Sequence, residues 1–294
     1  MRRPAAASGP RSLESILMFQ IALDREGISC GSIDGKLGTQ TRAAVRAFQE
    51  REQIPATGEL DAATRGRLLL TNALFRTIEV TTNDLQRIQP LSKTWLGKSQ
   101  QTALDYESIL EMFAERGHAH PELVRYLNPG VDWTNIPAGT ILRIPEVSRT
   151  NNLPKAAFIR IRLADKTLQA FDAQTNLLFH CPCSIAQKVE KRPVGELHVA
   201  AVAPRPNYTF DPDNFPESPE AQQIKTKLIL PPGPNNPVGT VWISLDRPGY
   251  GIHGTPGPEQ VGRTESHGCF RLANWNAEFL LGLVWVGLPV VVEP

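Results

Sequence analysis

Hydrophobic positions recur at helical spacing over the first part of the chain. After Ser12, apolar residues return every three or four positions, at Leu13, Ile16, Leu17 and Ile21. This period is typical of a helix that buries one face, with Ser12 as its N-cap and Gly27 at its end. A glycine-rich loop follows, Thr39 is placed to cap a second helix, and a third helix is expected to start at Asp61. The pattern predicts a small three-helix domain at residues 12–72.

A second, smaller module is predicted at residues 95–147. Helical spacing occurs around residues 106–116 and 121–126, and the apolar residues within 140–145 indicate a strand. Turns rich in glycine and proline separate these elements. The polar residues 148–152 then form a linker. We expect a small α/β module here, with a helical spacer as the simpler alternative.

From residue 155 onward, short strand-like runs dominate, and one helix is predicted late, at about residues 275–284. The runs lie at residues 158–163, 167–171, 177–183, 196–202, 241–245 and 288–293. Short strands without helices between them favour a sandwich or barrel-like domain. We therefore predict a multidomain α+β chain that ends in a mainly-β domain at residues 155–294.

Net charge and hydropathy argue against some classes of partner but do not identify one. Lys and Arg total 31 against 30 Asp and Glu, so the net charge of +1 gives no reason to expect nucleic acid or an anionic membrane as partner. The most apolar stretch, residues 279–292, is interrupted by glycine and proline, so we expect no membrane span. Residues 1–10 carry positive charge but lack the apolar core of a signal peptide, and none is visible in this chain.

The four cysteines are too few for a disulfide framework, and no pair has the spacing of zinc ligands. Cys181 and Cys183 lie two positions apart in an apolar run, so a strand would place both on one face. We interpret them as packing residues, with a redox pair as the alternative.

Two short segments combine histidine and cysteine in a way that suggests chemistry. Residues 251–255 read Gly-Ile-His-Gly-Thr, and residues 266–272 read Ser-His-Gly-Cys-Phe-Arg-Leu. A thiol becomes a useful nucleophile when a neighbouring imidazole takes its proton, so Cys269 with a histidine is the minimum machinery for acyl transfer. By ligand type, His253, His267 and Cys269 are also compatible with zinc, although we expect no metal or other cofactor.

This pattern resembles the signature of the L,D-transpeptidases, bacterial cell-wall enzymes. The signature has a histidine before a small residue, a variable loop, then Ser/Thr-His-Gly-Cys and an Asn or Arg two positions later. The resemblance implies that Cys269 is the nucleophile and that His253 is its general base. His267, although adjacent in sequence, is expected to line the site instead.

The same resemblance implies supporting roles for the other motif residues. The carbonyl of Gly254 would orient the imidazole, while Ser266 lines the site and backbone N–H groups around Gly268 form the oxyanion hole. Arg271 and Thr255 would bind the substrate.

Flanking segments agree with the family pattern. Residues 191–197 resemble its Thr-Pro-Thr-Gly-Glu-Phe segment, although Arg192 and Val194 replace the threonines. Residues 231–239 look like its Pro-Gly-Pro-x-Asn-Pro-Leu-Gly stretch, a stiff loop suited to walling a peptide groove. Residues 203–229 are a candidate lid over the site.

The two preceding segments resemble wall-binding modules. Residues 12–72 resemble the three-helix peptidoglycan-binding domain through Ile33-Asp34-Gly35, Gly38, Thr41, Ala44-Val45, Phe48-Gln49, Thr57-Gly58, Leu60-Asp61 and Thr64. Residues 95–147 look like a lysin motif, a fold that cradles N-acetylglucosamine chains. Its usual opening strand and turn are blurred, and residues 97–99 are the candidate replacement.

Together the resemblances imply an L,D-transpeptidase that joins peptidoglycan stem peptides, or attaches proteins to them, through a thioester on Cys269. Its partners would be stem peptides and glycan, with carbapenem-type inhibitors as expected ligands, and its place the periplasm or cell envelope. Alternatives are an L,D-carboxypeptidase that uses water as acceptor, a non-catalytic wall-binding scaffold and a cytosolic thiol hydrolase.

Overall fold

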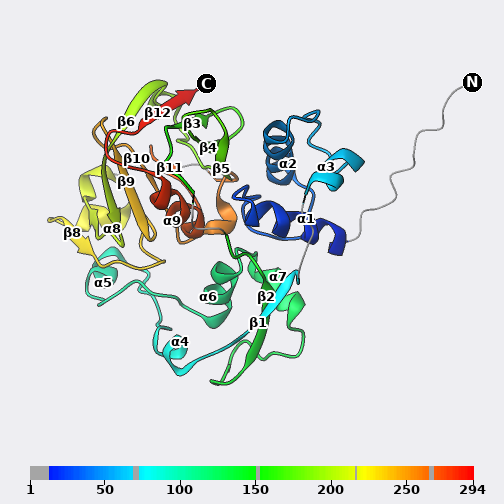
Figure 1. The fold of residues 1–294 in the computed structure, drawn as a ribbon. Helices are drawn as coiled ribbons and strands as arrows, with labels where there is room; N and C mark the ends of the chain where they lie inside the picture. The colour runs from blue at the N-terminus through cyan, green and yellow to red at the C-terminus, as the bar shows by residue number, and fades with distance from the viewer. Residues whose placement is uncertain (1–12, 69–72, 150–152, 216, 265–267) are drawn as a thin grey trace, which may run out of the picture.

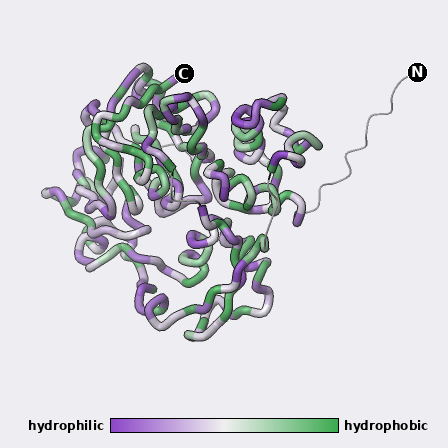
Figure 2. Tube along the Cα trace, in the orientation of Figure 1, coloured by the Kyte–Doolittle hydropathy of each residue, from purple (hydrophilic) through white to green (hydrophobic). Residues whose placement is uncertain are grey.

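The computed structural model describes residues 13–68, 73–149, 153–215, 217–264 and 268–294. Three regions can be followed in Figure 1: an N-terminal helical domain, a middle module and a C-terminal β domain. The multidomain α+β fold class predicted from the sequence is confirmed. Hydrophobic and hydrophilic residues alternate over short stretches of the chain (Figure 2), and none of the described helices is long and apolar enough to cross a membrane.

The N-terminal domain consists of α1 (Leu13–Arg25), α2 (Thr39–Arg51) and α3 (Ala62–Arg67). Its core is formed by buried side chains of the helices, among them Phe19, Leu23, Val45 and Phe48. One expectation was wrong: Thr39 is the first helical residue, and Gly38, in an extended conformation, takes the N-cap position without a side-chain bond. Ser12, the expected cap of α1, lies outside the described residues.

The middle module is closed by a strand that the sequence pattern did not indicate. β1 (Phe75–Glu79) pairs antiparallel with β2 (Ile141–Pro145), and the helices between them are α4 (Thr82–Gln86), α5 (Trp95–Ser99), α6 (Ile109–Arg116) and α7 (Pro121–Leu127). β1 lies before residue 95, and residues 97–99 belong to a helix rather than to an opening turn. β1 was missed because its side chains are partly or fully exposed, which leaves no clear apolar alternation.

The β domain is built on one curled sheet. Within the described residues its strand order is β11-β10-β9-β6-β12-β3-β4-β5. The strands are β3 (Phe158–Arg162), β4 (Thr167–Phe171), β5 (Leu177–Pro182), β6 (Gly195–Pro204), β9 (Val241–Leu245), β10 (Gly251–His253), β11 (Phe270–Arg271) and β12 (Pro289–Glu293). Ser184, just after β5, exchanges two backbone hydrogen bonds with Arg271 in β11 (2.9 and 3.0 Å). The two edge strands are therefore joined, and the sheet curls around its core.

Helix α9 (Asn274–Leu283) covers the inner face of the sheet, as the sequence predicted within one residue. Cys181 and Cys183 are buried free thiols of this core, consistent with packing residues.

The segment at residues 203–229 is partly structured. β7 (Tyr208–Phe210) pairs antiparallel with β8 (Leu228–Leu230), and α8 (Pro219–Gln223) lies between them in the chain. This small sheet packs against the middle module: the ring of Trp95 in α5 stacks on Phe210, with 4.3 Å between ring centroids. We call residues 208–230 the flap.

A buried ionic cluster joins all three regions. Asp24 in α1 is fully buried and accepts hydrogen bonds from Arg149 in the linker (2.6 Å), while His118 of the middle module lies 2.7 Å from its other oxygen. Arg149 also donates to Asn276 in α9 (3.1 Å). The charge of Arg149 and the hydrogen bonds to His118 and Arg149 outweigh the effect of burial and lower the pKa of Asp24 to about 2.

Candidate active site

The predicted histidine and cysteine lie on neighbouring strands at one edge of the sheet. β10 runs antiparallel to β9 and parallel to β11, with Ile252 opposite Phe270 and His253 opposite Arg271. Ile252 and Phe270 are buried in the core. Because side chains alternate along a strand, His253, Arg271 and the preceding Cys269 are directed to the opposite face.

His253 is buried and its ring is held in one orientation. Its side chain is 6% exposed, Nδ1 lies 2.6 Å from the carbonyl oxygen of Gly254, and the ring stacks against Trp242 of β9. A carbonyl oxygen only accepts, so in the neutral ring Nδ1 carries the hydrogen and Nε2 carries the lone pair. Burial lowers the pKa of His253 to about 4, although the bond to Gly254 opposes this shift. The imidazole is therefore a neutral acceptor at pH 7.

Cys269 is the partly exposed cysteine among four, the other three being buried. Its thiol donates to the carbonyl oxygen of Gly249 (3.5 Å). Burial raises the pKa of Cys269, while a hydrogen bond from the Gly251 backbone and the charge of Arg271 act in the opposite direction. A thiol with a raised pKa is protonated at pH 7 and needs a base to become nucleophilic.

Arg271 and Tyr208 complete the surroundings of the thiol. Burial lowers the pKa of the Arg271 guanidinium, and ionised Cys183 and Cys269 would act in the opposite direction. Burial also raises the pKa of Tyr208 in the flap, and the next largest contribution comes from Cys269. This coupling puts Tyr208 of the flap within electrostatic range of Cys269. The sequence suggested a lid here but not this residue.

The loop after His253 is fixed by an asparagine that the motif did not include. Thr255 is buried, and its backbone N–H donates to Oδ1 of Asn274 at the start of α9 (3.0 Å). Thr255 was expected to bind substrate; in the structure its backbone N–H binds Asn274. Nothing in the sequence marked Asn274, since an asparagine in the first turn of a helix is ordinary.

The structure describes only some of the remaining predicted site residues. Gly268 precedes the nucleophile and is described, whereas Ser266 and His267 lie outside the described residues. No metal-binding group of three His, Cys, Asp or Glu side chains occurs in the described part of the chain. The zinc alternative required His267 and so falls outside the described residues.

A buried, oriented imidazole and a cysteine at adjacent strand ends form the kind of site used by cysteine acyltransferases and hydrolases. Comparison with known families gives matches for two of the three regions. Residues 156–292 match the L,D-transpeptidase catalytic domain, and residues 12–68 match a family described as "Putative peptidoglycan binding domain". The β domain is thus similar to the L,D-transpeptidase catalytic-domain family, and the N-terminal domain to the peptidoglycan-binding one.

Individual relatives carry the same family name. The chain is 26% identical over 167 residues to the "Putative L,D-transpeptidase YkuD" of Bacillus licheniformis, an alignment that covers 57% of this chain and 82% of that protein. It is 28% identical over 192 residues to the "Probable L,D-transpeptidase YbiS" of Escherichia coli K12, covering 62% of this chain and 58% of that protein. Among solved structures, the E. faecium L,D-transpeptidase catalytic domain acylated by ertapenem aligns with 19% identity and a TM-score of 0.35. That alignment covers 48% of this chain and 99% of the other.

Proposed function

We propose that this chain is an L,D-transpeptidase that cross-links peptidoglycan stem peptides, or attaches proteins to them, through a thioester on Cys269. The observation that carries the proposal is the orientation of His253. The carbonyl of Gly254 holds the hydrogen on Nδ1, which leaves Nε2 to accept a proton on the face of the sheet shared with Cys269. The family match of the β domain supports the same reaction.

The reaction has two steps. His253 takes the proton of Cys269, and the sulfur attacks the carbonyl carbon of the third stem residue, at its bond to the terminal D-alanine. That C–N bond breaks, the leaving amine receives the proton from His253, and a thioester remains. An amine of a second stem, or of a protein, then attacks the thioester and gives its proton to His253. The proton returns to sulfur as the thiol is restored.

Electrostatic support comes from groups around the thiol. The backbone N–H groups around Gly268 and Cys269 are proposed to hold the developing oxyanion, and the Arg271 guanidinium to hold a carboxylate or carbonyl of the substrate. Ser266 and His267 are proposed to line the site, and Thr255 to contact the substrate.

The two other regions are proposed to hold the enzyme on its polymeric substrate in the cell envelope. The family match of residues 12–68 supports peptidoglycan binding by the N-terminal domain. For the middle module, the pairing of β1 with β2 and the helices α6 and α7 between them support a lysin-motif-like fold. We propose that it contacts the glycan strand.

Product analysis tests the reaction. The full chain is incubated with a tetrapeptide stem ending in D-alanine, and products are separated by mass. We expect D-alanine release together with a cross-linked dimer, and neither product with Cys269→Ala. Release of D-alanine without a dimer at any acceptor concentration would identify an L,D-carboxypeptidase instead. No release by the wild type would contradict both.

A further inference from the structure

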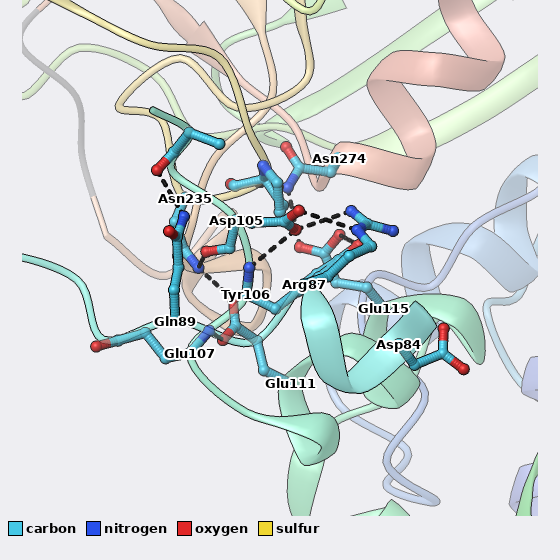
Figure 3. A network of polar contacts seen from close by, with 12 residues as sticks. Asp84, Arg87, Gln89, Asp105, Tyr106, Glu107, Glu111, Glu115, Asn235 and Asn274 are labelled. Carbon is cyan, nitrogen blue, oxygen red and sulfur yellow. Dashed lines mark hydrogen bonds and ion pairs between the residues drawn. The ribbon is translucent and has the colours of Figure 1, made fainter. Parts of the chain in front are cut away.

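One buried side chain ties the loop after His253 to the middle module. Asn274 is 1% exposed, and its Oδ1 accepts from the backbone N–H groups of Thr255 (3.0 Å) and Thr240 (3.3 Å). Its Nδ2 donates to the carbonyl oxygen of Pro234 (3.1 Å) and to Oε1 of Glu115 in α6 (2.9 Å). Both donors and both acceptor positions of the amide are therefore used. Figure 3 shows Asn274 and Glu115 within this network.

The backbone is shaped to receive this amide. A Cβ atom at Gly239 or at Gly254 would overlap Oδ1 of Asn274. Gly239 also has a positive φ of 63°, which a side chain would disfavour. Gly254 supplies the carbonyl that orients His253. The segment that fixes the imidazole is thus folded directly around the Asn274 side chain.

Glu115 is the residue of the middle module that binds the Asn274 side chain. It is partly buried, and its second carboxyl oxygen accepts from the hydroxyl of Tyr106 (3.3 Å). Burial raises the pKa of Glu115 to about 8. The charges of Glu111 and Glu278 raise this pKa further, whereas the hydrogen bond from Asn274 lowers it. Near pH 7 the residue is therefore mostly uncharged, and its effect on Asn274 comes from the hydrogen bond rather than from charge.

A second contact between the same regions offers a matched control. Glu111, one turn earlier on α6, accepts from Nδ2 of Asn235 in the proline-rich loop (2.5 Å). That amide also donates to the backbone carbonyl of Asp105 (3.0 Å). Glu111 therefore bridges the same two regions as Glu115 without contacting Asn274 (Figure 3).

We propose that Glu115 is a positioning residue for His253, acting through Asn274, so that the middle module completes the active site of the β domain. The inference rests on the proposed function, because it concerns the base of that reaction. When the acceptor on Glu115 is lost, Nδ2 of Asn274 keeps only Pro234, and the amide is freed to turn. The backbone at Thr255 and Gly254 then loosens, and water reaches the imidazole.

The test compares Glu115→Leu, Glu115→Gln and Glu111→Leu in the full chain. Leucine fills a similar volume without an acceptor, whereas glutamine keeps one. Stopped-flow measurement of carbapenem acylation separates binding from the first-order acylation step. We expect Glu115→Leu to slow acylation about 10- to 100-fold with carbapenem affinity unchanged, because small displacements of a catalytic group cost about this much. Glu115→Gln should stay within about threefold of wild type, as should Glu111→Leu.

A second readout needs no acylation. The pKa of His253, measured by NMR titration of its ring, should rise by about one unit or more in Glu115→Leu as water enters, and stay constant in the other two variants. A folded Glu115→Leu with wild-type acylation and wild-type His253 pKa would overturn the proposal. Equal slowing of acylation in Glu111→Leu would also overturn it, because the loss of any contact between the middle module and the β domain would then slow the reaction.

The outcomes separate the two proposals. If the wild type forms no adduct, the proposed function fails, and the His253 titration alone decides whether Glu115 positions the ring. Should Glu115→Leu fail to fold, Asn274→Asp is measured in the same ways. Aspartate keeps the acceptor for Thr240 and Thr255 and loses the donor towards Glu115. Wild-type behaviour of a folded Asn274→Asp would then overturn the proposal.

Discussion

Burial sets the protonation states of His253 and Cys269 at rest. It lowers the pKa of the imidazole and raises that of the thiol, so both are neutral at pH 7. In the proposed reaction a neutral pair differs from a thiolate–imidazolium pair, because the proton moves only when a substrate is attacked. The Gly254 carbonyl makes this possible by fixing the ring hydrogen on Nδ1.

The pH dependence of acylation follows from this state. The pKa of His253 is about 4. Its neutral form, the one that acts as a base, persists well below the pH at which an ordinary histidine, with a pKa of about 6.5, is half protonated. We expect the carbapenem acylation rate of the wild type to fall to half its plateau near pH 4, measured by stopped flow across the acidic range. A midpoint near the ordinary histidine value would show that the ring is solvated rather than buried.

At the level of single residues, the motif predicted the contact between the Gly254 carbonyl and His253, and it named Cys269 and His253 for the proposed roles of nucleophile and base because each carries chemistry that requires its residue type. Asn274 and Tyr208 could not be predicted in the same way. Asn274 acts on backbone groups that come near it only in the folded chain, and Tyr208 comes within electrostatic range of the cysteine only through the packing of the flap.

At the level of elements, the flap depends on the middle module. Trp95 of α5 contacts Phe210, Phe215 and Tyr208, with centroid separations of 4.3, 5.8 and 6.3 Å. Its backbone N–H donates to Oε1 of Glu220 in α8 (2.5 Å). Three-residue strands pair too weakly to stand alone, so these contacts hold the flap in place.

Replacing Trp95 should therefore loosen the flap. In Trp95→Ala we expect the backbone amides of β7 and β8 to lose about 10- to 100-fold of their hydrogen-exchange protection, because aromatic contacts that stabilise the closed flap are removed. Protection in β3 and β4 should not change. Trp133→Ala, which removes a partly buried tryptophan that packs against the core of the middle module, is the matched control and should leave the flap amides protected. Unaltered flap protection in Trp95→Ala would contradict this view.

The ends of most strands of the β domain could be predicted within one or two residues, because each long run of apolar residues ends at a turn. The runs at 167–171 and 241–245 coincide with β4 and β9. β10 and β11 have three and two residues, too few to show a period. β1 and the flap strands depend on their partners for pairing and burial, which sequence periodicity does not reveal.

At the level of the whole molecule, buried polar contacts join the three regions. Asp24, His118, Arg149 and Asn276 come from the N-terminal domain, the middle module, the linker and the β domain. His118 also stacks on Trp275 of α9. Composition and periodicity divided the chain into parts but gave no sign of this junction, because its members are far apart in sequence.

Breaking the junction should destabilise the whole chain. In Asp24→Ala, Arg149 keeps its buried position, with a 5% exposed side chain, and loses the carboxylate that balances its charge. We expect a loss of about 3–5 kcal/mol in unfolding free energy, measured by urea denaturation. Asp132→Ala, an exposed aspartate, is the control and should cost less than about 1 kcal/mol. A small effect in Asp24→Ala would mean that the regions fold independently.

The pH dependence of stability has a definite sign at this junction. The pKa of Asp24 is about 2 in the folded chain, below its unfolded value of about 4. Its contribution is therefore complete above about pH 4 and is lost as the pH falls towards 2. In Asp24→Ala the loss of unfolding free energy between about pH 4 and 2 that comes from Asp24 should be absent.

We propose that Cys269 forms the acyl-enzyme with His253 as its base. Intact-protein mass spectrometry after exposure to a carbapenem tests it most directly, with wild type, Cys269→Ala and His253→Ala compared under identical conditions. We expect one stable adduct on Cys269 in the wild type, none in Cys269→Ala and much slower formation in His253→Ala. A wild-type chain that forms no adduct, and whose Cys269 is also inert towards simple alkylating reagents, would contradict it and leave a wall-binding scaffold.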